Sequence, residues 1–241
     1  MTEPGTPRGN PMRQHVEAMI HNDDRRGLLD IAGMLHGHFC NYLAYGVVAG
    51  ASAVRELGVQ NTGMEEVVAL VETNNCFADG IQLTTGCSFG NNALVYEDLG
   101  KTAFSLVRRD GEGVRYVLDP EFEDSREAAY PEAYGLWKRL IVDKEEARPE
   151  ELAGMMRLFH EMTLQEIDVP VETMFRIQKG RFDLPPPSMM YPWVRCARCG
   201  ENVMENRIRM VQKETLCLAC AGESVFAVDS RGIGPKHKVR A

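Results

Sequence analysis

The sequence lacks the hydrophobic segments that would direct a chain to a membrane or through it. No apolar run approaches the ~20 residues that a helix needs to cross a bilayer. Residues 1–11 are rich in Pro, Gly and Thr and have none of the apolar core of a secretory signal, so we expect a disordered lead-in. These absences predict a cytoplasmic protein that has no membrane partner and whose thiols stay reduced.

Positive charge is also scarce. The chain has 27 Lys and Arg against 35 Asp and Glu, a formal net charge of −8. Residues 193–241 hold nine basic and five acidic residues (net +4), whereas the other 192 residues hold 18 and 30 (net −12). Nucleic acid is therefore an unlikely partner for the body of the protein. The basic end either contacts an anionic partner or is simply a solvated surface.

The remaining composition, 44% hydrophobic and 26% charged, is that of an ordinary globular protein. The apolar pattern predicts an α+β fold, with helices packed on a mixed or antiparallel sheet. Helices are expected at 12–22, 25–35, 38–57, 76–84 and 131–165, and strands at 67–71, 102–107, 114–118 and 175–182. Ala or Gly occupies six of the ten positions 44–53. This helix should therefore be buried with another backbone close by, and a partner subunit is one candidate for that neighbour.

A proline-rich linker at 183–192 predicts the boundary between two domains. The α+β core is expected at 12–182 and a small second domain at 193–225. Residues 226–241 are interpreted as a basic tail.

Four cysteines in the second domain form two C-x-x-C pairs separated by 17 residues: Cys196 and Cys199, then Cys217 and Cys220. This spacing is typical of a zinc ribbon in which four thiolates hold one structural ion. A domain of this size has too small a core to fold unaided, so the metal would supply much of its stability. The alternative, a redox dithiol, requires only one such pair at a helix start.

A second set of potential ligands lies in the segment His36-Gly37-His38-Phe39-Cys40. On a continuous helix, His36 and Cys40 would share one face. If Gly37 ends the helix, His38 and Cys40 would instead line one wall at the start of the next helix, where the helix dipole favours a thiolate. Either arrangement suits zinc or another transition metal.

Further polar groups follow in the segment that starts at Cys76. Asp79 lies one helical turn beyond it, Gln82 another three residues on, and Cys87 eleven residues from Cys76. Free cysteines are commonly buried as small hydrophobic residues, which is the alternative for each of them taken alone. A cluster of His, Cys, Asp and Gln predicts a functional pocket.

These motifs, taken in order, resemble the FmdE family, which is named after one component of molybdenum/tungsten formylmethanofuran dehydrogenase. The family pattern has His-Gly-His-x-Cys-Pro-Gly, then Cys-x-x-Asp-Ala-Ile-Gln with Gly-Cys-Thr-x-Gly-Lys, then Gly-Lys-x-Ala-Phe, and many members end in a four-cysteine ribbon. The corresponding segments here are 36–40, 76–82, 86–90, 100–104 and 195–220. Among the departures of this chain from the pattern, Asn41-Tyr42 replaces Pro-Gly, Gly80 replaces Ala, and Asn91 replaces the lysine.

The resemblance implies an α+β core that forms an intertwined homodimer, with a metal-containing pocket near the interface and an appended zinc ribbon. The leading hypothesis is a metal-binding protein, enzymatic or part of a larger enzyme, that acts on a small molecule or a one-carbon or pterin-like cofactor. The expected ligands of the core metal are His36, His38, Cys40 and Cys87.

The other pocket residues are given catalytic roles in this hypothesis. Cys76 would be a further ligand or a reactive thiol, Asp79 a general base or the partner of a ligand histidine, and Gln82 a substrate-orienting group. Lys101 would hold an anionic group, or is a solvated strand residue. The alternative function is a non-catalytic accessory or regulatory protein whose ribbon docks a partner protein or nucleic acid. Redox chemistry between Cys76 and Cys87 ranks last.

Overall fold

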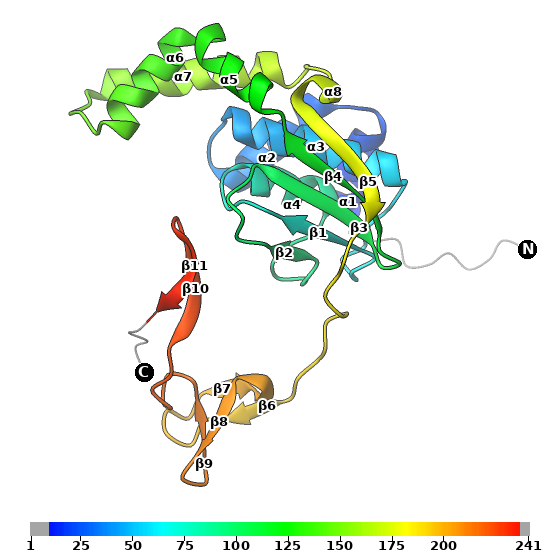
Figure 1. Ribbon diagram of the computed structural model, residues 1–241, viewed down its shortest axis with the longest axis vertical. Helices are drawn as coiled ribbons and strands as arrows, with labels where there is room; N and C mark the ends of the chain where they lie inside the picture. The colour runs from blue at the N-terminus through cyan, green and yellow to red at the C-terminus, as the bar shows by residue number, and fades with distance from the viewer. Residues whose placement is uncertain (1–9, 237–241) are drawn as a thin grey trace, which may run out of the picture. The chain divides into compact units, whose positions relative to one another are not determined.

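A five-stranded mixed sheet organises the first of two structural units (Figure 1). The computed structural model describes residues 10–236 and divides between Pro185 and Pro186. Most of the expected lead-in and the last five residues of the expected tail lie outside the described residues. The strand order is β2-β1-β3-β4-β5, and only the β1–β2 pair is parallel. The bounds are Val67–Val71 for β1, Leu94–Tyr96 for β2, Ala103–Arg108 for β3, Glu112–Leu118 for β4 and Phe175–Arg181 for β5.

Four helices and the strands they cover enclose the main core. They are α1 (Pro11–His21), α2 (Arg25–His36), α3 (Asn41–Leu57) and α4 (Phe77–Thr85). Alternate residues of β1 point to opposite faces: Val67, Ala69 and Val71 join this core, whereas Val68 and Leu70 pack with Val107 on the other face. The α+β prediction is confirmed.

The small residues of α3 pack against α4 of the same chain. A Cβ atom added at Gly46 would lie 2.2 Å from the carbonyl oxygen of Phe77, and one at Gly80 would lie 2.5 Å from the amide nitrogen of Val47. Two glycines facing each other thus bring the two helix backbones together. These small residues therefore face α4 of the same chain and not a partner subunit.

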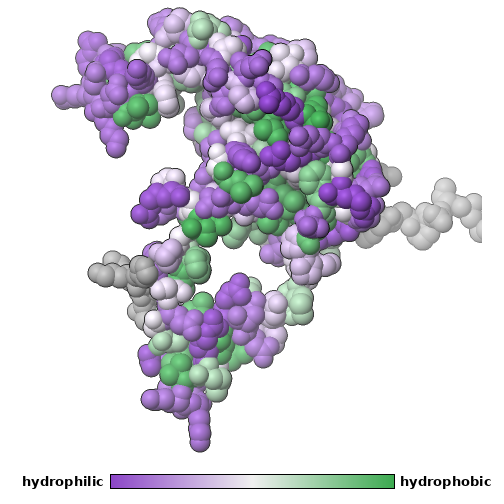
Figure 2. Space-filling view, viewed as in Figure 1, coloured by the Kyte–Doolittle hydropathy of each residue, from purple (hydrophilic) through white to green (hydrophobic). Residues whose placement is uncertain are grey.

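A helical arm connects β4 to β5 (Figure 1). It consists of α5 (Pro120–Ala129), α6 (Pro131–Trp137), a π-helical turn (Lys138–Val142), α7 (Pro149–Glu166) and the short α8 (Val171–Met174). The single helix expected at 131–165 is therefore two helices, because Pro149 starts a new helix after a charged loop. Apolar patches interrupt the polar surface of the arm (Figure 2). They include Trp137, Ile141 and Val142, whose exposed fractions are 41, 46 and 50%.

The second unit is built from three two-stranded antiparallel pairs. They are β6 (Trp193–Arg195) with β7 (Asn202–Met204), β8 (Ile208–Val211) with β9 (Glu214–Cys217), and β10 (Val225–Asp229) with β11 (Gly232–Lys236); a 3-10 turn, η2, spans Glu205–Arg207. The last pair corrects the expectation of a tail from residue 226. Asp229 accepts a hydrogen bond from the backbone N–H of Arg231, and Gly232 has a φ of 101°, so a tight turn forms between two β-prone segments.

Among residues 10–236, no helix is both long and apolar enough to span a bilayer.

Candidate metal centres

Four potential ligands from three helix ends meet in the first unit. The ligand atoms of His36, His38, Cys40 and Cys76 all lie within 4.8 Å of one another. His36 is the last residue of α2, and Gly37 ends that helix in a left-handed conformation with a φ of 90°. Cys40 and Cys76 are the residues immediately before α3 and α4. The break at Gly37 thus brings both histidines and Cys40 together. Cys40 therefore has both His36 and His38 beside it, whereas the sequence offered these pairs as alternatives.

His36 is oriented by a carboxylate. Its Nδ1 lies 2.7 Å from Oδ2 of Asp79, and Oδ1 of Asp79 accepts a hydrogen bond of 3.0 Å from the side-chain amide of Gln82. Nε2 of His36 is buried and has no hydrogen-bond partner among the described residues. Buried polar atoms without a partner are rare, whereas a histidine that ligates a metal through one nitrogen usually donates its other N–H to a carboxylate or carbonyl. The orphaned nitrogen therefore fits a metal ligand.

The pKa values of the two thiols in this group shift in opposite directions. The hydrogen bond with Cys40, followed by the nearby His36, lowers the pKa of Cys76 to about 5, despite partial burial. The same hydrogen bond, followed by burial, raises the pKa of Cys40. Burial acts to lower the pKa of His36, but Asp79 and Cys76 outweigh it and the net shift is upward. Sulfur and imidazole donors so close together form a set suited to zinc or a similar ion.

The other residues expected at this site lie elsewhere or behind it. Asp79 and Gln82 support His36 from behind, as the hydrogen bonds above show. Lys101 is exposed two residues before β3 and is not among the residues that line the cavities described below.

Cys87 is not brought to this group. It follows the opposite end of α4 from Cys76, and a nine-residue helix is about 14 Å long. Its side chain is 0% exposed, with the sulfur 3.5 Å from the amide nitrogen of Asn61 and 3.6 Å from the carbonyl oxygen of Val67. Burial raises its pKa to about 11.

A cavity of about 280 Å³ opens beside the ligand group. It is lined by His38, Phe39, Cys40, Asn41, Tyr42, Cys76, Tyr134, Trp137, Met155, Met156 and Phe159. The last five belong to the arm and carry no sequence signal for this site. They lie more than 90 positions from Cys40, and no spacing rule connects them to it. Two phenol–carboxylate contacts border this region, Tyr42 with Glu123 and Tyr45 with Glu166.

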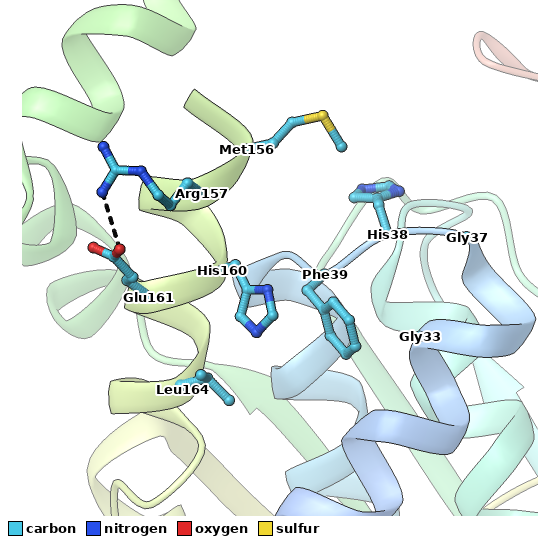
Figure 3. Close-up of a pocket in the computed structure, with 9 residues that line it drawn as sticks. All are labelled: Gly33, Gly37, His38, Phe39, Met156, Arg157, His160, Glu161 and Leu164. Carbon is cyan, nitrogen blue, oxygen red and sulfur yellow. Dashed lines mark hydrogen bonds and ion pairs between the residues drawn. The ribbon is translucent and has the colours of Figure 1, made fainter. Parts of the chain in front are cut away.

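A second cavity, of about 540 Å³, lies between the loop after α2 and helix α7 (Figure 3). The rings of Phe39 and His160 lie side by side, with centroids 4.6 Å apart, and Arg157 pairs with Glu161 on the side of α7 away from Phe39. His38 and Phe39 line both cavities. His38 is thus the member of the ligand group most open to an approaching molecule.

The second unit contains the four ribbon cysteines, whose sulfur atoms also lie within 4.8 Å of one another. The backbone N–H of Cys217 donates to the sulfur of Cys196, and that of Cys220 to the sulfur of Cys217, each at 3.4 Å. Backbone N–H groups, first that of Cys199, lower the pKa of Cys196 to about 6. Four convergent sulfurs supported by backbone donors are a structural zinc site.

Comparisons with known proteins find a family match in each of the two units. Residues 35–176 match the family described as "FmdE, Molybdenum formylmethanofuran dehydrogenase operon", and residues 190–225 match the "Prokaryotic dksA/traR C4-type zinc finger". A "Probable S-adenosyl-L-methionine-binding protein" of Archaeoglobus fulgidus is 37% identical over 211 residues. These residues are 86% of this chain but 55% of the relative, so the chain spans about half of that protein's length.

A crystal structure of a tungsten formylmethanofuran dehydrogenase FmdE-like protein from Syntrophus aciditrophicus has the same fold. It matches with a TM-score of 0.53 and 22% identity, covering 82% of this chain and 92% of the other. The FmdE match extends over more than half of the 241 residues. The chain therefore belongs to the FmdE family and has a C4 zinc finger at its C-terminal end.

Proposed function

We propose that the first unit is a metal-dependent small-molecule-binding module in which His36, Cys40 and Cys76 hold one zinc or similar transition-metal ion, with His38 at the open side. The observation that carries the proposal is the buried Nε2 of His36, which has no partner among the described residues and lies in a group of two thiols and a second imidazole. A thiolate- and imidazole-bound ion of this kind supplies Lewis acidity to a molecule that reaches its open position.

Each neighbouring residue has a defined part in this proposal. Asp79 fixes the tautomer and orientation of His36, and Gln82 fixes Asp79. The aromatic and methionine side chains of the arm exclude water from the 280 Å³ cavity. His38 is exposed and borders both cavities, so an incoming ligand meets it first. Lys101 and Cys87 have no part in binding the metal.

S-adenosyl-L-methionine is the first ligand to test, because the Archaeoglobus relative bears that compound in its name. Its sulfonium cation is compatible with a cavity lined by aromatic rings and thioethers.

Cobalt substitution tests the proposal directly. Cobalt(II) bound by thiolates absorbs visible light, and loading a protein whose ribbon is already occupied by zinc would make the core the only coloured site. We expect one equivalent of cobalt to produce this absorption, S-adenosyl-L-methionine or another ligand to shift it, and Cys76→Ser to abolish it. Cys87→Ala is the matched control and should leave the absorption unchanged. A wild-type protein that takes up no cobalt would refute the proposal.

The proposal also includes a homodimer in the cytoplasm, held through the arm. The exposed Trp137, Ile141 and Val142 would be buried by a second copy. Light scattering during size-exclusion chromatography should give twice the 27.0 kDa mass of the chain, and a charged substitution, Ile141→Glu, should return the monomer.

Docking of a partner protein by the second unit is a second candidate function. Trp193 and Phe226 are 64% and 76% exposed in a small, basic unit. Surface aromatic residues of this kind commonly anchor protein interfaces. If the wild type captures one defined protein and Phe226→Ser does not, the result would support this role. If Phe226→Ser captures the same proteins as the wild type, the result would contradict it.

A further inference from the structure

The cavity beside the core ligand group has chemical features that restrict what it can bind. Apart from the metal-ligating side chains, its walls are mainly aromatic rings and the thioethers of Met155 and Met156. Among the described residues that line it, none is Lys or Arg. Such walls favour a planar ring that is neutral or cationic, and they disfavour an anion.

A buried carboxylate fixes the hydrogen bonds next to this cavity. Glu166 is 1% exposed, and its Oε1 lies 3.0 Å from the guanidinium of Arg126. Its Oε2 accepts a hydrogen bond of 2.5 Å from the hydroxyl of Tyr45. Burial, reinforced by the charge of Glu166, raises the pKa of Tyr45, so this phenol keeps its proton and donates a hydrogen bond to the carboxylate.

This contact determines which way the side-chain amide of Asn41 points. Because the hydrogen of Tyr45 is used by Glu166, its oxygen can only accept, and it does so from Nδ2 of Asn41 at 3.3 Å. The same Nδ2 donates to the hydroxyl of Tyr134 at 3.4 Å. Within residues 10–236, Oδ1 of Asn41 then remains as an acceptor at the cavity wall.

Tyr134 supplies a donor beside that acceptor. Its oxygen accepts from Asn41, so its own hydrogen is available to a molecule in the cavity that Tyr134 lines. Burial raises the pKa of Tyr134 to about 12, so the hydroxyl is protonated at neutral pH. The wall thus presents a hydrogen-bond acceptor and a hydrogen-bond donor side by side.

We infer that Asn41 and Tyr134 are a specificity-determining pair that recognises the edge of a planar nitrogen heterocycle carrying a donor next to an acceptor, as in an aminopurine. Asn41 accepts from the amino group and Tyr134 donates to the adjacent ring nitrogen. Arg126, Glu166 and Tyr45 are positioning residues for the pair. The inference rests on the proposed function, since it names the class of molecule that this same pocket binds.

Three purines of similar size test the pair one hydrogen bond at a time. Purine lacks the amino group of adenine, and 1-deazaadenine has C–H in place of N1, the ring nitrogen next to the amino-bearing carbon. Neither analogue is larger than adenine at the edge that the pair would contact, so neither introduces a clash. By calorimetry, we expect the wild type to bind adenine about tenfold more tightly than either analogue, which is the effect of one net hydrogen bond. Tyr134→Phe should lose the preference over 1-deazaadenine and keep the preference over purine. Asn41→Ser should show the opposite pattern.

Tyr130→Phe is the matched control, because Tyr130 lies one helical turn from Tyr134, bonds to Gln165 and does not line the cavity. Equal binding of the three purines by the wild type, no binding of adenine at millimolar concentration, or equal effects of Tyr130→Phe and Tyr134→Phe would overturn the inference. Metal content measured on the same samples separates this result from the proposed function. A full core metal site without base preference refutes only the purine pair, and an empty core site refutes the metal proposal.

Discussion

The carboxylate behind His36 gives the core site a measurable weak point. Asp79→Ala removes the acceptor that holds Nδ1 of His36 at 2.7 Å, and it leaves the imidazole free to rotate and to change tautomer. Loss of such a partner typically lowers metal affinity 10- to 100-fold, or about 1.4–2.7 kcal/mol. Gln82→Ala removes only the 3.0 Å bond that orients Asp79, so we expect a loss of less than tenfold.

Competition with a chromophoric chelator measures both effects in the full-length protein. The chelator should remove zinc from the wild type in two phases, one for each site. In Asp79→Ala, only the core phase should shift to a lower chelator concentration. Asp30→Ala is the control, since it removes the same charge from the exposed side of α2. If Asp79→Ala binds the core metal as tightly as Asp30→Ala does, the assignment of His36 as a metal ligand is wrong.

Three further predictions follow from the packing of the first unit. Gly46→Ala places a Cβ atom 2.2 Å from a backbone oxygen of α4, so the free energy of unfolding should fall by about 1–3 kcal/mol or more in thermal denaturation. An unchanged melting temperature would contradict the close α3–α4 contact. Arg126→Met leaves buried Glu166 without its cation and should lower the free energy of unfolding in urea by about 3–5 kcal/mol. Adding Glu166→Gln should recover much of this loss, and no recovery would argue against the ion pair. Cys87 should resist iodoacetamide at pH 8 in the folded protein, because its sulfur is buried and burial raises its pKa to about 11. Mass spectrometry should detect modification only as the pH approaches that value. Ready modification at pH 8 would contradict its buried position.

The strands and the ribbon were predictable because their signals are local. The β-branched stretch at 67–71 is β1 without any shift in its bounds, and the glycine-containing turn after Arg109 joins β3 to β4 as expected. The spacing of the ribbon cysteines also determined their site, since a C-x-x-C turn places both sulfurs on one ion. Three-residue β2 was missed because so short a strand has no periodicity to detect.

The core site was only half accessible from the sequence, because it depends on which helix ends meet. The His36–Cys40 segment identified itself by composition, yet the choice between Cys76 and Cys87 as its partner is made by α4, which places one at each of its ends. The contribution of Tyr134 and Trp137 to the cavity arises from the return of the arm over the start of α3. No local pattern encodes such a long-range contact, so neither residue could be assigned to the cavity from the sequence.

Metal content per chain tests the central claim most directly. Protein purified without oxygen and analysed for elements should hold two ions per chain in the wild type and one in Cys40→Ser and in Cys76→Ser, because each removes a ligand from the core while the ribbon keeps its zinc. Cys87→Ala should retain two. One ion per chain in the wild type, with no change in Cys40→Ser or Cys76→Ser, would contradict the account and leave the zinc ribbon as the protein's metal site.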